Sequence, residues 1–279
     1  MTAIPGSAAA VTGGASGIGR ALARELAARG CDLALADRDE AGLASVVAEL
    51  AKSGRKVTMH HVDVSEPSQI EAFAAVAIAA HPTLNILINN AGVALLGQFN
   101  EIDQAQFEWL MNINFWGVVH ATRVFLPQLS SRPAAHIVNV SSIFGIIAPP
   151  GQTAYCASKF AVRGFSEALR HELKLAQSPV KLSVVHPGGI ATNIVRNMRT
   201  GVAVTDNARR AEVIEFFDKE FAKTTAQAAA TAIITGIEKN APRILIGGDA
   251  RMLDRLQRIL PGTYFRILKR RMAKREEQA

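Results

Sequence analysis

The chain has little cysteine: only Cys31 and Cys156 occur among its 279 residues. Two cysteines cannot build a disulfide framework or a four-cysteine metal site, and we expect both to be small core residues. No His/Cys cluster with metal-ligand spacing is present, so we expect no metal site. The N-terminus carries no signal peptide, and the cysteine usage fits a reducing compartment, so we expect a cytoplasmic location.

Long apolar runs are also missing, because every apolar stretch is interrupted well before the roughly 20 residues that a membrane-spanning helix needs. Charge is unevenly spread. Residues 251–279 hold nine Lys or Arg and three Asp or Glu, a net +6 of the chain's total of +7. The nearly neutral remainder argues against a body that binds nucleic acid and makes the basic tail a separate question.

Short apolar segments alternate with longer helical patterns. Continuous apolar strands are typical of a parallel sheet that helices cover on both faces. We therefore predict an α/β fold, a doubly wound, mostly parallel seven-stranded Rossmann sheet in a single domain over residues 1–250. The predicted strands are 8–12, 32–36, 56–62, 84–88, 136–140, 181–185 and 243–246, and the predicted helices are 17–29, 41–53, 68–80, 107–129 and 155–176.

A glycine-rich segment, residues 12–19, joins the first strand to the first helix. Gly13 allows a tight turn, Gly17 lets backbone approach a pyrophosphate, and Gly19 lets the helix pack close to the strand. The helix N-terminus then offers free N–H groups and a positive dipole to phosphates. This context predicts dinucleotide binding, and the residues that we assign to it are Gly13, Ser16, Gly17, Ile18 and Gly19.

The second strand ends in Asp37, about twenty residues beyond the glycines, where an acid holds the ribose hydroxyls of the cofactor. Its carboxylate would repel the 2′-phosphate of NADP, which favours NAD. Arg38 follows directly and keeps NADP open as the alternative. Asp37 could also serve only as the N-cap of the next helix.

The motifs together resemble the short-chain dehydrogenase/reductase family over nearly the whole chain. The matching residues, in order, are the glycine loop, Asp63, Asn89-Asn90-Ala91-Gly92, Asn114 before Gly117, Ser142, Tyr155-Cys156-Ala157-Ser158-Lys159 and Pro187-Gly188-Gly189-Ile190-Ala191-Thr192. The resemblance implies that Asp63 touches the adenine ring, that the Asn-Asn-Ala-Gly run braces the cofactor, and that Ile190 and Thr192 fix the nicotinamide carboxamide. The further cofactor contacts that it implies are Val64, Asn90, Ala91, Gly92, Pro187 and Gly188.

The family spacing selects Ser142 over Ser141, and its Asn-x-x-Gly pattern selects Asn114 over Asn112. Tyr155 and Lys159 lie four apart, on one helix face. A free tyrosine has a pKa of about 10, and a neighbouring ammonium favours the phenolate, so we expect Lys159 to lower the pKa of Tyr155.

We predict Tyr155 as the acid/base. We expect Lys159 to bind the cofactor ribose as well. Ser142 could hold the substrate oxygen, and Asn114 could anchor a water that connects Lys159 to solvent.

The predicted activity is hydride transfer between NAD(H) and an apolar alcohol/ketone pair. The alternatives are an NADPH-dependent ketoreductase and a non-catalytic cofactor-sensing or interaction protein. The predicted apolar pocket uses residues 93–97 and 143–152, under a lid at about 193–225. Many of these residues could instead form core or dimer contacts, and the arginines of the lid could attract an anionic substrate or simply be solvated.

Residues 251–279 form a basic, amphipathic C-terminal extension, broken by Pro261-Gly262. We expect it to cover the substrate mouth or a sheet edge and to limit assembly to a homodimer, formed through the helices 107–129 and 155–176. Contact with an anionic membrane surface is the less favoured alternative.

Overall fold

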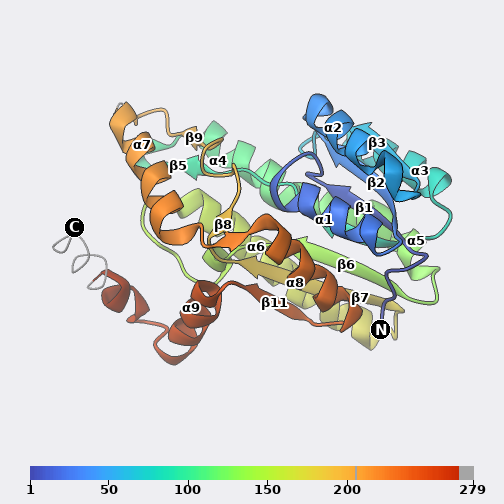
Figure 1. Cartoon of the computed structure of the whole chain (residues 1–279). Helices are drawn as coiled ribbons and strands as arrows, with labels where there is room; N and C mark the ends of the chain where they lie inside the picture. Colours follow the sequence, from blue (N-terminus) through green and yellow to red (C-terminus); the bar gives the residue numbers. More distant parts are fainter. Residues whose placement is uncertain (205, 270–279) are drawn as a thin grey trace.

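The computed structural model describes residues 1–204 and 206–269. Its centre is a seven-stranded sheet with the order β11-β7-β6-β4-β1-β2-β3, in which every neighbouring pair is parallel (Figure 1). The predicted fold class is confirmed, and each predicted strand begins and ends within two residues of an observed one. The strands are β1 (Ala8–Thr12), β2 (Asp32–Asp37), β3 (Val57–His61), β4 (Leu84–Asn89), β6 (Ala135–Val140), β7 (Val180–Pro187) and β11 (Arg243–Ile246).

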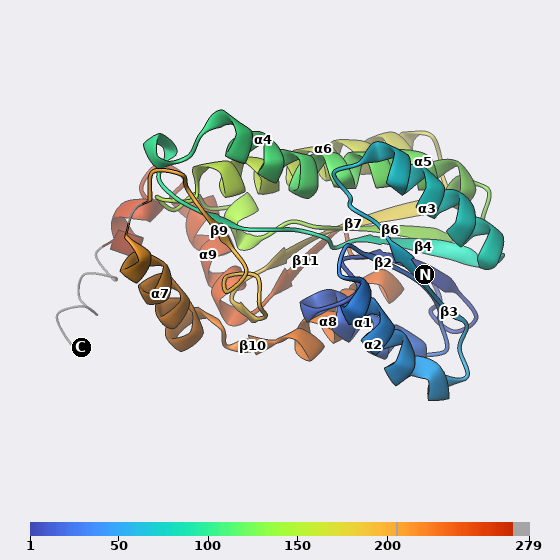
Figure 2. The same cartoon turned by 90° about the horizontal axis from the view of Figure 1, so that it is seen from above.

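Helices cover both faces of the sheet (Figure 2). On one face lie α1 (Gly17–Ala28), α2 (Glu40–Leu50) and α8 (Ala226–Glu238). On the other lie α3 (Pro67–Ala80), α5 (Gly117–Ser130) and α6 (Thr153–Leu175). Strand β4 illustrates why the strands are apolar throughout: Ile86 and Ile88 pack into one core and Leu84 and Leu87 into the other.

The predicted helix over residues 107–129 is continuous, but it contains a π-helical turn at its centre. The segment consists of α4 (Gln104–Met111), a π-helical turn η3 (Asn112–Trp116) and α5. A π turn accommodates one extra residue and is frequent at functional sites. Periodicity at helical spacing cannot reveal it, because the flanking α-helical segments each keep a regular pattern.

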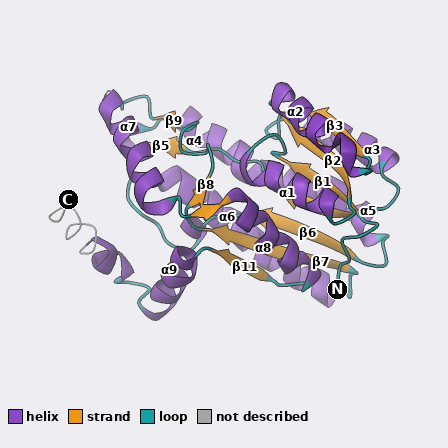
Figure 3. Ribbon diagram, viewed as in Figure 1, coloured by secondary structure: helices purple, strands orange, loops and turns teal. Residues whose placement is uncertain are grey.

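Two short ladders join the predicted lid region, residues 193–225, to the rest of the chain. Strand β5 (Leu95–Leu96) pairs with β9 (Arg199–Thr200), and β8 (Ile190–Ala191) pairs with β10 (Thr224–Thr225). The strands β5, β8 and β9 are labelled in Figure 3. Between these ladders the lid contains α7 (Asn207–Phe216) and a second π turn, η5 (Phe217–Phe221). The 3-10 turns are η1 (Ala51–Ser53), η2 (Phe99–Glu101) and η4 (Ile143–Gly145).

Helix α9 (Gly248–Ile259) follows the edge strand β11 directly. Its buried residues Ala250 and Leu253 join a small apolar cluster with Ile143, Ile146 and Ile147, the segment that follows β6. The C-terminal extension therefore packs on the loop that we expected to line the substrate pocket. In the described part of the chain, no helix combines the length and the hydropathy that crossing a bilayer requires.

Candidate active site

The glycine loop between β1 and α1 is packed so closely that side chains are excluded. A Cβ on Gly13, whose φ is +68°, would lie 2.8 Å from the Cα of Ala91. A Cβ on Gly19 would lie 1.9 Å from the carbonyl oxygen of Gly13. Gly17 also has positive φ, +51°, and a Cβ there would meet only the Thr192 side chain, at 3.3 Å. The loop therefore needs glycine for its backbone path and its close contacts.

The N-terminus of α1 has donors that no side chain satisfies. Ser16 is the N-cap, but its hydroxyl makes no capping hydrogen bond, and the first turn contains no acidic residue. The first N–H groups of a helix have no intrahelical partner and carry the positive end of the dipole. Ser16 is exposed and Gly17 and Ile18 are half-buried, so the site fits an incoming phosphate.

Asp37 lies at the end of β2, beside this loop. Its carboxylate accepts a hydrogen bond of 3.0 Å from the Ala15 N–H and one of 3.1 Å from the Asp39 N–H. The N-cap of α2 is Asp39, which accepts from Gly42, so Asp37 is not used for capping. Arg38 is exposed next to it. A half-exposed carboxylate beside the phosphate loop suits ribose hydroxyls.

The Asn-Asn-Ala-Gly run after β4 braces the glycine loop. The Asn90 side chain donates to the carbonyl oxygens of Thr12 and Gly13, both at 3.0 Å. The Thr12 hydroxyl in turn accepts from the backbone N–H groups of Asn90 and Ala91. The run is therefore fixed to the end of β1.

Asp63 and Val64 follow β3 at the same edge of the sheet. The Asp63 carboxylate accepts from both the N–H and the hydroxyl of Ser65. Val64 is buried against Gly117, where an added Cβ would approach the Val64 side chain to 3.1 Å. The two residues therefore lie between the sheet edge and the start of α5.

Tyr155, Lys159 and Ser142 come together at the carboxyl end of β6. The Lys159 ammonium lies 5.7 Å from the centre of the Tyr155 ring and donates to the Val140 carbonyl oxygen at 3.1 Å. The Ser142 hydroxyl forms a hydrogen bond with the Tyr155 phenol. The Phe144 ring stands edge-on to the Tyr155 ring, with 6.1 Å between the ring centres. Ser141 points elsewhere, since its hydroxyl donates to the Lys159 carbonyl oxygen.

Burial dominates the titration of this group. Removal from water raises the pKa of Tyr155 to about 12, and the hydrogen bond with Ser142 only partly opposes that shift. Burial also lowers the pKa of Lys159 to about 8. The expected lowering of the Tyr155 pKa by Lys159 is therefore not found, because desolvation by burial is the largest influence on this pKa. Tyr155 is a phenol, and Lys159 can exchange its proton close to neutral pH.

Asn114 lies in the π turn η3 and is fully buried. Its side-chain oxygen accepts from the Val93 N–H at 2.8 Å, and its nitrogen donates to the Val93 carbonyl oxygen and to the Ser158 hydroxyl. Asn112, by contrast, is exposed. A Cβ on Gly92 would lie 3.3 Å from the Asn114 oxygen and 3.4 Å from the Lys159 nitrogen, so these two side chains converge beside Gly92.

The segment from Pro187 to Thr192 crosses above Gly17 and carries β8. The Asp249 carboxylate, at the start of α9, accepts a hydrogen bond of 2.7 Å from the Gly189 N–H. It also fills the space that a side chain on Gly188 would need. Asp249 was not predicted, although a Gly-Gly-Asp sequence directly after the last strand offered a signal.

His186 holds the other side of the site. Burial lowers its pKa to about 4, so the ring is neutral. Its Nδ1 lies 3.0 Å from the Ser142 carbonyl oxygen, to which the Nδ1–H tautomer donates. His186 is fully buried and contacts the backbone of Ser142, so its ring supports the position of that residue.

The surroundings of Tyr155 are apolar. Buried Leu95, Leu110 and Ala154 form a cluster against which Val93, Ile102, Phe107, Trp109 and Tyr155 pack. Part of the predicted pocket, including Ile143, Ile146 and Ile147, is buried core beneath α9. A further hollow of about 330 Å³ opens beside the start of α6, and its lining residues are Ala148, Pro149, Pro150, Thr153, Cys156 and Phe265.

Most of the lid arginines contact other parts of the protein. Arg209 forms a 2.7 Å ion pair with Glu101, and Arg196 forms one of 2.6 Å with Asp218. The Arg199 guanidinium stacks over the Trp109 ring, 3.9 Å from its centre. The contacts of Arg209 and Arg199 join the predicted lid to the body, whereas the Arg196–Asp218 pair lies within the predicted lid. With these arginines engaged, there is little support for an anionic substrate. Among the described residues, no group of three or more His, Cys, Asp or Glu is arranged to hold a metal ion.

Residues 7–203 match the family model described as short chain dehydrogenase. The chain is 41% identical over 274 residues to an oxidoreductase named SadH from Mycobacterium tuberculosis, covering 98% of each chain. It is 32% identical to the dehydrogenase/reductase SDR family member 7B of Mus musculus, covering 95% of this chain and 80% of that protein.

Among solved structures, a short-chain dehydrogenase/reductase from Burkholderia phymatum in complex with NAD superimposes with a TM-score of 0.84 at 32% identity, covering 93% of this chain and 95% of that one. The fold, the family model and these relatives agree. The chain therefore belongs to the short-chain dehydrogenase/reductase family, oxidoreductases that act on CH–OH groups with a nicotinamide cofactor.

Proposed function

We propose that this chain transfers a hydride between NAD(H) and an apolar alcohol/ketone pair, with Tyr155 as the general acid/base. The observation that carries the proposal is the meeting of the Tyr155 phenol, the Ser142 hydroxyl and the buried Lys159 in an apolar environment. Asp37 beside the glycine loop supports NAD, as does the relative that was solved with NAD.

The glycine loop, Asp37, Asp63, Val64, the Asn-Asn-Ala-Gly run and the 187–192 segment would hold the cofactor, whose nicotinamide ring supplies the hydride chemistry. In ketone reduction, Tyr155 donates its proton to the substrate oxygen, while Ser142 donates a hydrogen bond to the same atom as charge develops. In alcohol oxidation, Tyr155 accepts the hydroxyl proton, having first lost its own. Lys159, with its pKa of about 8, and Asn114 provide the route for that proton.

A second candidate is an NADPH-dependent ketoreductase. Two features favour it: Arg38 is exposed beside Asp37, and the phenol of Tyr155 is protonated in the free protein, which is the form that reduction requires. NAD remains the preferred cofactor, because the Asp37 carboxylate would stand close to a 2′-phosphate.

We also propose that residues 1–250 form one catalytic domain with a lid at about 193–225, and that the protein works in the cytoplasm as a homodimer. The exposed rings of Trp116 and Phe160, from η3 and α6, support a dimer through these helices. The packing of α9 on the 143–147 segment supports a role for the C-terminal extension in covering the substrate pocket.

The test is nicotinamide absorbance during turnover of apolar secondary alcohols and ketones, with NAD(H) and NADP(H) in parallel. Tyr155→Phe should lower kcat by a factor on the order of 100 to 10,000, the usual contribution of general acid/base catalysis, while cofactor binding is retained. A Tyr155→Phe protein as active as wild type would contradict the mechanism. Binding of cofactor without turnover of any substrate would point to the sensing alternative.

A further inference from the structure

Helix α9 has two chemically different faces. At 100° per residue, the buried Ala250, Leu253 and Asp254 lie on one side of the helix. Arg251, Met252, Arg255, Arg258 and Ile259 lie on the opposite side and are exposed. Within this outward face, the arginines and the apolar residues form two adjacent stripes along the helix. Ile259, the last residue of α9, is 75% exposed, although isoleucine is among the residues most often buried in folded proteins.

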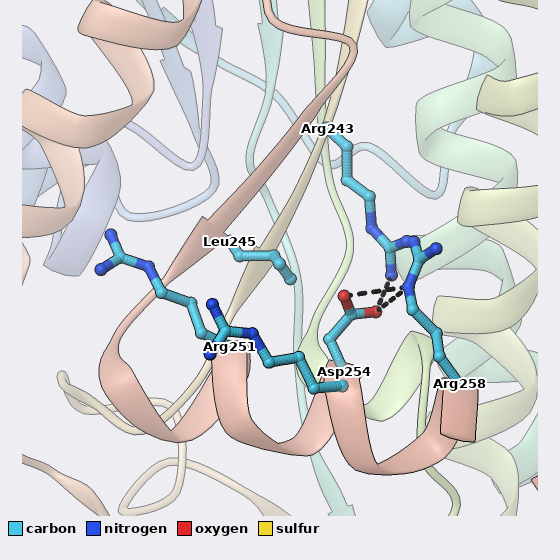
Figure 4. Close-up of a pocket in the computed structure, with 6 residues that line it drawn as sticks. Arg243, Leu245, Arg251, Asp254 and Arg258 are labelled. Atoms are coloured by element: carbon cyan, nitrogen blue, oxygen red, sulfur yellow. Dashed lines mark hydrogen bonds and ion pairs between the residues drawn. The ribbon is translucent and has the colours of Figure 1, made fainter. Parts of the chain in front are cut away.

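Four guanidinium groups surround one hollow of about 390 Å³ between β11 and α9, which is lined by Arg243, Leu245, Arg251, Asp254, Arg255 and Arg258. Asp254 is the only acidic residue of this lining. It accepts from Arg243 at 2.5 Å and from Arg258 at 3.1 Å, while the side chain of Arg251 extends away from it (Figure 4). The hollow therefore keeps a large excess of positive charge.

Asp254 pairs with two of the four guanidinium groups, those of Arg243 and Arg258. Within the described residues, the side chains of Arg251 and Arg255 make no hydrogen bond or ion pair. The Nε of Arg243 is buried and has no hydrogen-bond partner among the described residues. Planar guanidinium groups pair well with phosphate oxygens, often through two parallel hydrogen bonds. A phosphate-bearing ligand would pair with the exposed guanidinium groups of Arg251 and Arg255.

Further exposed apolar and basic residues follow α9 in the sequence. Leu260 is 36% exposed and Phe265 is 37% exposed, and Arg266 and Lys269 are exposed beside Phe265. This segment is fixed in place, because the Tyr264 hydroxyl accepts a hydrogen bond of 2.9 Å from the Ala148 N–H. Exposed apolar side chains and exposed bases therefore alternate from the outward face of α9 to Lys269.

We propose that this surface, formed by the outward face of α9 and by Leu260, Phe265, Arg266 and Lys269, docks on an anionic phospholipid bilayer. Basic residues would pair with lipid phosphates, while Ile259, Leu260 and Phe265 would enter the boundary between headgroups and acyl chains. A nucleic acid would use the arginines but gain nothing from the apolar stripe. Self-association through this surface would bring the positive stripes of two copies together, and like charges repel.

The test uses the full chain and sedimentation with large vesicles, either of phosphatidylcholine alone or of equimolar phosphatidylcholine and phosphatidylglycerol. We expect binding to the anionic vesicles, little binding to the neutral ones, and weakening by added salt. Each basic residue near such a surface contributes about a fivefold gain in binding. Arg251→Gln/Arg255→Gln should therefore lower the partition coefficient on the order of twentyfold, and Ile259→Ser/Leu260→Ser should lower it severalfold.

Matched controls remove the same groups elsewhere on the surface. Lys52→Gln/Lys239→Gln neutralises two exposed bases outside the proposed dimer helices, and Val76→Ser replaces an exposed apolar side chain on α3. Both controls should bind anionic vesicles within about twofold of wild type. Equal losses of vesicle binding in the control and α9 variants would overturn the proposal, because they would show that binding depends only on the net charge of the protein.

Three other results would also overturn it. The first is equal binding to neutral and anionic vesicles, and the second is no binding to either. The third is binding of a DNA duplex that Arg251→Gln/Arg255→Gln weakens and Ile259→Ser/Leu260→Ser does not, together with unchanged vesicle binding in both variants. Light scattering completes the experiment, since assembly that only Ile259→Ser/Leu260→Ser abolishes would assign the surface to a second copy. None of these readouts depends on enzymatic activity, so they stand apart from the test of the proposed function.

Discussion

The carboxylate of Asp249 accepts a hydrogen bond from the backbone N–H of Gly189, at 2.7 Å, and so joins the first turn of α9 to the segment expected to hold the nicotinamide. The two residues are 60 positions apart in the sequence. Because the Asp249 side chain also occupies the space above Gly188, it restricts the path of that segment on two sides.

Replacing Asp249 with alanine should therefore weaken cofactor binding. A hydrogen bond to a charged group contributes about 1.5–3 kcal/mol, and we expect the KM for NAD to rise about tenfold with a smaller change in kcat. Steady-state kinetics at saturating substrate would measure this. Asp32→Ala is the matched control, since Asp32 accepts from the Lys56 N–H at the opposite end of the sheet. An unchanged KM for Asp249→Ala would show that the segment needs no such support.

Burial of Lys159 should make stability depend on pH. Its pKa falls from 10.5 to about 8 on folding, so between these values the unfolded chain binds more protons than the folded one. Stability should consequently rise with pH over this window, by about 3 kcal/mol in total. The raised pKa of Tyr155 acts in the opposite direction only above pH 10 or so.

Urea unfolding at pH 7 and pH 9.5 would measure this effect. The gain in stability should disappear in Lys159→Met and persist in Lys181→Met, which removes an exposed lysine from β7. The quantity compared is the change in unfolding free energy between the two pH values. Lys159→Met also loses the hydrogen bond to the Val140 carbonyl oxygen, but that loss lowers the unfolding free energy equally at both pH values. A wild-type protein with the same stability at both pH values would contradict the expectation.

Cofactor choice should depend on the charge of Asp37 more than on its shape. Asp37→Asn keeps an acceptor for the Ala15 N–H but removes the repulsion of a 2′-phosphate. We expect NADP use to improve on the order of tenfold and NAD use to weaken. Arg38→Ala should lower only the use of NADP. Initial rates with both cofactors decide the matter, and an Asp37→Asn protein with unchanged cofactor preference would remove Asp37 from its proposed role.

The proposed dimer places two exposed aromatic residues in an interface. Trp116 is 45% exposed and Phe160 is 40% exposed, and a charge at either position would be costly once buried. Trp116→Glu/Phe160→Glu should therefore produce a monomer by light scattering. The Val76→Glu variant, which changes an exposed position on α3, should remain dimeric. A clean tetramer in the wild-type protein would refute the dimer itself.

The sheet and its order of elements were accessible from sequence because continuous apolar strands and amphipathic helices leave strong periodic signals. The glycine loop was equally clear, since Gly13 and Gly19 lie where contacts exclude a side chain. Helix α8 was missed, although it is rich in alanine and isoleucine. Its residues follow the lid, and no glycine or proline marks where it begins.

Interactions between distant residues were less accessible. No local pattern reveals that Asp249 reaches Gly189, or that His186 contacts the backbone of Ser142. The pKa of Tyr155 was expected to fall because only its neighbour Lys159 was considered. Burial, which depends on the whole fold, raises it instead. Sequence spacing identifies which groups meet, whereas the packing around them sets their protonation.

The π turn η3 has a consequence for how this protein tolerates insertions and deletions. An extra residue that adds no extra turn rotates the side chains of all later residues by about 100° around the helix axis. Leu110, before the turn, faces the cluster around Tyr155, and Phe125, after it, faces the core beneath the sheet. Losing a single residue between them would turn one of these faces away from its partner. The length of this helix is thus more tightly constrained than its composition, and a substitution at exposed Asn112 should be tolerated where its deletion is not.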